Sequence, residues 1–131
     1  MPSIRRETYY KIVGRDNLPK FFQNLEVALN LKIPININMV VHQLNKDQVY
    51  EEAKFMKENY GIKKFAVTPM LRPAYRELDG YDLILEENIK IFEDLIRLRE
   101  EGMITAILEV TPKCGIPEKL RDDAIFSRGC S

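Results

Sequence analysis

The sequence predicts an α/β fold in which parallel strands alternate with amphipathic helices. Hydrophobic residues recur at helical spacing in three segments, and three short segments of strand-like pattern lie between and after them. A single helix between consecutive strands favours a right-handed crossover, which makes the neighbouring strands parallel. The predicted order is therefore helix, strand, helix, strand, helix, strand and an irregular tail.

The predicted helices combine an apolar stripe with ordinary start and stop signals. They cover residues 18–31, 47–59 and about 86–101. Pro19 suits a first helical turn, and Asp16 or Asn17 offers an N-cap before it. Gly61 and Gly102 are natural terminators for the second and third helices. Residues 1–14 have a mixed pattern that predicts no element.

The predicted strands cover residues 33–41, 63–69 and 103–110. The first, IPININMVV, alternates strictly, so its aliphatic side chains share one face and Asn36 and Asn38 lie on the other. Continued two residues at a time through Val40, the amide face reaches His42. Buried amides without partners cost about 1–3 kcal/mol each, so they indicate a polar lumen or ligand cavity. An edge strand with a solvated face, and His42 in a surface loop, is the alternative.

The second strand carries a weaker version of the same pattern. Ala66, Thr68 and Met70 would share a face, opposite Phe65 and Val67. Small side chains beside an amide face leave room for a ligand. The adjacent glutamate pairs on the helices are interpreted instead as solvated faces; they are Glu51 and Glu52, Glu86 and Glu87, and Glu100 and Glu101.

Composition excludes several classes of function. Lys plus Arg equals Asp plus Glu, so the formal net charge is zero and no global field attracts nucleic acid or an anionic membrane. No apolar run approaches the roughly 20 residues that span a bilayer. Two cysteines, Cys114 and Cys130, provide no disulfide framework, and a cytoplasmic location is expected. There is no glycine-rich phosphate loop, H-E-x-x-H motif or serine nucleophile elbow.

The order of several loose motifs resembles the second half of the barrel in radical S-adenosylmethionine (radical SAM) enzymes that carry a SPASM or twitch-type C-terminal extension. The matching pieces are Ile12-Val13-Gly14, the helix 18–31, IPININMVV, Asn45, the helix 47–59, KKFAVTP and Gly129-Cys130-Ser131. The resemblance implies a partial (half) TIM-like barrel over residues 1–110. Residues 111–131 would then begin the cysteine-containing extension.

The resemblance also implies site residues. The SAM pocket would be lined by Asn36, Asn38 and Thr68, and by the backbone of Pro69 and Met70. His42 would lie on the substrate rim. Cys130 would ligate an auxiliary iron–sulfur cluster in the intact parent, with Cys114 as a further candidate, whereas two ordinary free cysteines are the alternative.

The chain departs from the family where the chemistry is concentrated. The family's C-x3-C-x2-C loop, which holds a four-iron cluster, has no counterpart here, and Val13 stands where many members have Arg. An intact parent would cleave SAM to a 5′-deoxyadenosyl radical. The chain alone is expected to be inactive, to bind no cofactor, and to pair with the missing N-terminal half or with a second copy through the open sheet face. The rival hypothesis is a stand-alone α/β binding or interaction module.

Overall fold

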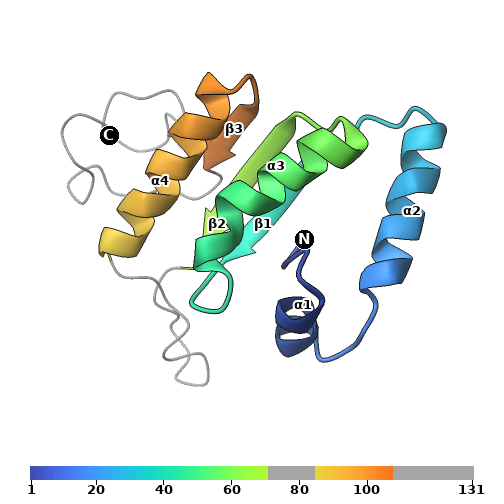
Figure 1. Ribbon diagram of the computed structural model, residues 1–131, viewed down its shortest axis with the longest axis horizontal. Helices are drawn as coiled ribbons and strands as arrows, with labels where there is room; N and C mark the ends of the chain where they lie inside the picture. The colour runs from blue at the N-terminus through green and yellow to red at the C-terminus, as the bar shows by residue number, and fades with distance from the viewer. Residues whose placement is uncertain (71–84, 108–131) are drawn as a thin grey trace.

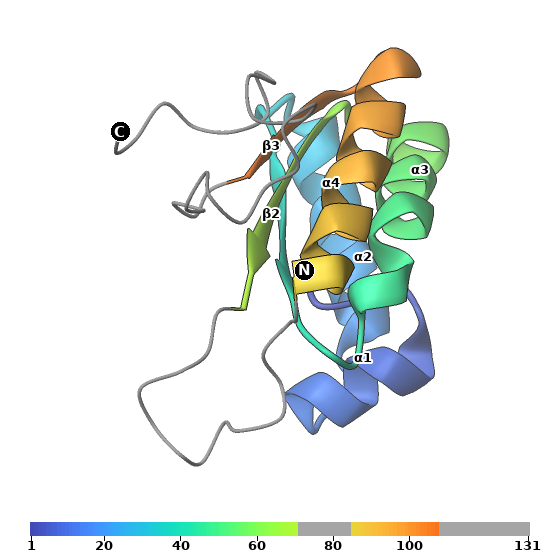
Figure 2. The same cartoon turned by 90° about the vertical axis from the view of Figure 1, so that its left-hand side faces the viewer.

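A computed structural model describes residues 1–70 and 85–107, which form a parallel sheet with helices on one side (Figures 1 and 2). The strands are β1 (Ile37–Val41), β2 (Lys64–Pro69) and β3 (Ile104–Ile107), in the order β1-β2-β3. Both pairs are parallel, with Met39 opposite Val67 and Val67 opposite Ile107. The predicted α/β fold with three alternating parallel strands is confirmed.

The helices are α1 (Arg6–Val13), α2 (Leu18–Asn30), α3 (Val49–Tyr60) and α4 (Leu85–Glu100), and a 3-10 turn, Lys46–Gln48, leads into α3. Figure 2 shows α2, α3 and α4 on the same side of the sheet and α1 beyond one end of it. α3 and α4 pack against each other, and α2 reaches α3 through Phe22, whose ring stacks on that of Tyr60. The short helix α1 was not predicted from the sequence.

Local sequence explains where these helices start and stop. Pro19 lies in the first turn of α2, as expected. Asn17 is the N-cap residue but makes no side-chain cap bond, and Asp16 instead pairs with Arg6 of α1. Gly61 ends α3 at φ 67°, a conformation in which a Cβ is strained, and its N–H donates to carbonyls of the last turn.

The hydrophobic core lies between the sheet and the α3–α4 pair. Alternate strand residues point into it, and the buried faces are apolar except for Thr105 of β3, whose hydroxyl donates to the carbonyl of Leu95. Its least exposed members are Met39, Val41, Phe65, Val67 and Ile107 of the sheet, Val49, Ala53 and Met56 of α3, and Ile91, Phe92, Leu95 and Leu98 of α4.

One predicted boundary differs from the observed one by several residues. The first strand begins at Ile37 rather than at residue 33, because Lys32 turns the chain at φ 56° and Pro34 has no N–H to donate to a ladder. The third strand is described only as far as Ile107. The predicted loop 71–83, the boundary at residues 110 and 111, the tail and both cysteines lie outside the described residues. No helix within residues 1–70 and 85–107 is long and apolar enough to cross a bilayer.

Candidate ligand-binding face of the sheet

The face of the sheet that points away from the helices carries the other set of alternating side chains. It presents amide, hydroxyl, ammonium and small apolar groups. They are Asn38 and Val40 of β1, Lys64, Ala66 and Thr68 of β2, and Ile104 and Ala106 of β3, all exposed or half-buried. The predicted separation of Asn36, Asn38, Ala66 and Thr68 from the aliphatic face is therefore confirmed.

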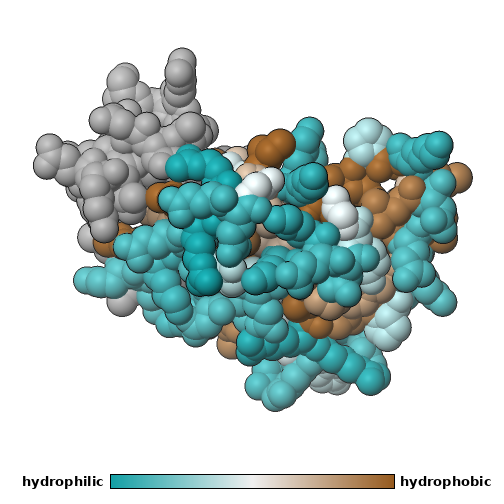
Figure 3. Space-filling model, turned by 45° about the horizontal axis from the view of Figure 1, so that its top comes forward, coloured by the Kyte–Doolittle hydropathy of each residue, from teal (hydrophilic) through white to brown (hydrophobic). Residues whose placement is uncertain are grey.

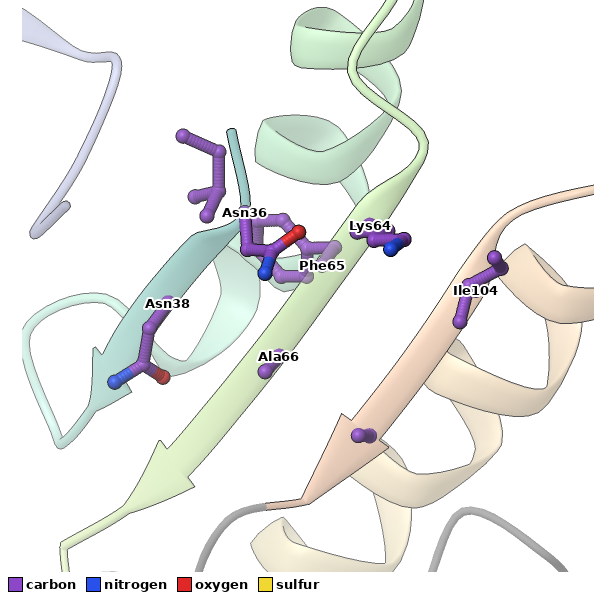
Figure 4. Close-up of a pocket in the computed structure, with 8 residues that line it drawn as sticks. Asn36, Asn38, Lys64, Phe65, Ala66 and Ile104 are labelled. Carbon is purple, nitrogen blue, oxygen red and sulfur yellow. The ribbon is translucent and has the colours of Figure 1, made fainter. Parts of the chain in front are cut away.

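A hollow of about 270 Å³ lies on this open face. Figure 4 shows Asn36 and Asn38 on one side of it, Lys64 and Ala66 along the middle strand, and Ile104 on the far strand. Ile37, Phe65 and Ala106 complete the lining, and two of the lining residues, Ala66 and Ala106, carry only a methyl group. The hollow thus combines apolar space with amide and ammonium groups, a mixture typical of small-molecule sites.

A side-chain contact across the first two strands fixes one of these amides. The hydroxyl of Thr68 donates to Oδ1 of Asn38 over 3.2 Å. The amide nitrogen of Asn38 consequently lies on the side away from β2, as Figure 4 shows. A ligand in front of β1 would therefore meet an oriented donor rather than a freely rotating amide.

Pro69 and Met70 lie where β2 ends. The side chain of Pro69 is on the buried side of the sheet, opposite that of Thr68. The backbone N–H of Met70 donates to the carbonyl of Val41 over 2.7 Å, so this donor is already used. The structure thus brings together Asn36, Asn38 and Thr68 among the predicted pocket residues, whereas contact of the Pro69 and Met70 backbone with a ligand stays a prediction.

His42 lies in a closed turn, which differs from both interpretations of the sequence. It is only 7% exposed, and the strand ends at Val41, so the alternation that would place His42 on the open face stops there. Nδ1 accepts from the N–H of Leu44 over 3.2 Å. Burial lowers the pKa of His42 below 6.5, which favours neutral imidazole at pH 7 with its proton on Nε2.

The turn depends on Asn45, a residue that the sequence singled out only as a piece of the family resemblance. Its Oδ1 accepts from the N–H of His42, and its Nδ2 donates to the carbonyls of Val40 and Pro2, each over 2.9 Å. Asn45 is 1% exposed. One side chain therefore joins the end of β1, the turn after it and the N-terminal segment.

Glu52 is the second residue that sequence reasoning missed, and the expectation of a solvated glutamate pair is wrong for it. Glu51 is exposed and pairs with Arg5, whereas Glu52 is 0% exposed. Neither carboxylate oxygen has a hydrogen-bond partner of good geometry. Burial raises the pKa of Glu52 from 4.5 to about 8, while the Met1 ammonium and the N–H of Ile4 act in the opposite direction.

A signal for Glu52 was present in the helical spacing. It lies three residues after Val49 and four before Met56, both of which are fully buried, so it falls on the inward stripe of α3. Among the other pairs, Glu87 is half-buried and pairs with Lys46, whereas Glu86, Glu100 and Glu101 are exposed.

Within the described ranges, no three His, Cys, Asp or Glu side chains lie close enough together to hold a metal ion. Comparison with known protein families, with curated proteins and with solved structures finds no match to this chain. Any functional assignment therefore rests on the open face and its chemistry.

Proposed function

We propose that this chain is the C-terminal half of a radical SAM-type barrel and that its open sheet face contributes to a SAM-binding surface. The observation that carries the proposal is the hollow lined by Asn36, Asn38 and Lys64 on a face that no described helix covers. In a closed barrel this face would line the lumen. The order of the motifs from Ile12 to Pro69, which resembles that of the family, also supports the proposal.

The residues present suit the polar parts of SAM. The oriented amide of Asn38 can donate to a ring nitrogen or ribose oxygen, and the Lys64 ammonium can attract the carboxylate of the methionine moiety. Ala66 and Ala106 leave space for a flat ring to lie against the sheet. The described residues hold no thiolate set for an iron–sulfur cluster, so no reaction step is assigned to this chain.

Uncovered apolar side chains near α2 also support a larger assembly. Val27, Leu31 and Ile33 are 58%, 68% and 50% exposed. Figure 3 shows hydrophobic surface gathered at the end of the molecule where Figure 1 places α2. Contiguous exposed apolar surface is typical of interaction sites, and the missing half of the barrel is a natural cover for it.

Amide chemical shifts test the proposal. Titration of the full chain with SAM up to millimolar concentration should move the amide signals of Asn38, Ala66, Thr68 and Ala106 and leave those of α3 unmoved. Asn38→Leu, which removes the oriented amide, should weaken SAM binding about tenfold, a loss expected for one hydrogen bond to a ligand. Asn59→Leu is the matched control, since Asn59 is exposed at the end of α3.

Two results would contradict the proposal. One is the absence of any shift on the open face at millimolar SAM. The other is an equal response to ATP, which shares the adenosine but carries no sulfonium or amino acid, and which would favour a stand-alone nucleotide-binding module. An unchanged affinity in Asn38→Leu, with shifts confined to the face, would place SAM elsewhere on it.

A further inference from the structure

The edge of β1 that faces away from β2 is filled by a short extended segment, residues 1–4. The Met1 ammonium donates to the carbonyl of Asn38 over 2.8 Å, and Asn45 bonds the carbonyl of Pro2. The Ser3 hydroxyl donates to Oε1 of Gln48, at the start of α3. Figure 1 shows the N-terminus beside β1 and α3, on the side toward α1 and α2. We call residues 1–4 the arm.

The arm covers Glu52 but does not neutralise it. The Met1 ammonium and the backbone of Ile4 act on the pKa of Glu52, so both lie near its carboxyl group. No ion pair within 4.0 Å forms between Met1 and Glu52 among the described residues, and neither carboxylate oxygen accepts a hydrogen bond of good geometry, since the N–H of Ile4 makes only a weak contact with the group. Burial disfavours the ionised form of this carboxyl group, so a cation placed beside it would stabilise that form.

The Met1 ammonium is already a positive charge near this carboxyl group. Desolvation lowers the pKa of Met1, and the smaller effect of Glu52 raises it. The arm therefore provides one hydrogen bond to the strand edge, from the Met1 ammonium, and this cation forms no ion pair with the carboxyl group of Glu52.

We propose that the outer edge of β1, with Glu52 behind it, is the docking site for an extended segment of another polypeptide that brings a Lys or Arg side chain to Glu52, and that the arm is displaced when this segment docks. Addition of a strand to an exposed edge is a common mode of recognition. Edge hydrogen bonds would give affinity, and the buried charge pair would give register and specificity.

The nature of the occupant rests on the proposed function, because in a barrel the strand of the missing half would lie at this edge. The existence of the docking site does not depend on the proposed function. The SAM titration reports on the open face, and the docking experiments report on Glu52 and the edge of β1, so one can fail while the other succeeds.

The first experiment introduces the cation into the arm of the full chain. One arm residue at a time, Met1, Pro2 or Ile4, is replaced by Arg or by the neutral Gln. Each variant is made with the natural Glu52 and again with Glu52→Gln. At one position at least, Arg should lower the unfolding constant about tenfold relative to Gln, and Glu52→Gln should abolish that difference. The carboxyl carbon signal of Glu52 should then titrate at least one pH unit lower, which a purely structural effect would not produce.

The second experiment tests docking in trans. The arm sequence with the favoured Arg, and its Gln counterpart, are added to the chain as free peptides of residues 1–6. The Arg peptide should bind about tenfold more tightly and shift the amide signals of Asn38 and Val40, and Glu51→Gln should leave this preference intact. If no arm position couples to Glu52, or if both peptides bind equally or not at all, the proposal is overturned.

Discussion

Replacement of Glu52 by Gln should make the isolated chain more stable, although it removes an ionisable residue from a helix. The unfolded chain ionises this carboxyl near 4.5, whereas burial keeps it protonated up to about pH 8 in the folded chain. Folding at neutral pH must therefore take up a proton or bury a charge. Gln has nearly the same shape and never ionises, so it escapes this penalty.

The magnitude is obtained from the two pKa values. A rise from 4.5 to about 8 corresponds to roughly 5 kcal/mol of lost stability once the pH exceeds both values, and to about 3 kcal/mol at pH 7. Because the folded pKa is the higher one, the full stability is present below about pH 4.5 and declines as the pH rises toward 8. Glu52→Gln should flatten this decline.

Urea unfolding followed by circular dichroism at intervals between pH 4.5 and 8.5 measures the effect. Glu51→Gln is the matched control: Glu51 is exposed and pairs with Arg5, so its loss should change stability by about 0.5 kcal/mol or less at every pH. Parallel pH profiles for the wild-type chain and Glu52→Gln would refute the reasoning, since they would show that Glu52 ionises equally in both states.

Two further substitutions test the turn and the core. Asn45→Ala removes three hydrogen bonds from a residue that is 1% exposed, so it should lower the free energy of unfolding in urea by about 2–3 kcal/mol. Asn59→Ala, at an exposed position, should lower it by less than about 0.5 kcal/mol, and equal losses would contradict the role of the turn. Met56→Ala should lower the free energy of unfolding by about 2–5 kcal/mol, because Met56 is fully buried between α3 and the sheet. Val27→Ala, at a position that is 58% exposed, should change the thermal midpoint little, and a small loss for Met56→Ala would show that the core closes around the gap.

The fold and the open face could be predicted because both depend on periodicity alone. Alternation in IPININMVV separates Asn38 from Met39 wherever the strand lies, and helical spacing places Met56 and Leu95 inward. The helix α1 was missed because RETYYKIV buries only Tyr9, so no apolar stripe marks it. Its clearest signal was Gly14, which ends the helix in the left-handed conformation at φ 75°.

The errors at the candidate site come from tertiary contacts that no periodicity records. The amide face was predicted to continue to His42, but the strand ends one residue earlier, because the side chain of Asn45 accepts a hydrogen bond from the N–H of His42 in a turn. Glu52 was judged by its charge rather than by its place between Val49 and Met56. Whether Asn36, Asn38 and Thr68 bind SAM stays a prediction, as does the iron ligation by Cys114 and Cys130.

The strand order β1-β2-β3 also bears on how the chain acquires its structure. Each strand pairs with the next one in sequence, so α3 lies in the connection closed by the first pairing, α4 lies in the one closed by the second, and no described strand must wait for a distant partner. Pairing with the next strand lowers the entropic cost of closing each loop relative to pairing with a more distant one. The β1–β2 pair requires no residue after Met70, so α4 and β3 can be added to a pair that already exists, and the core closes only when both are in place.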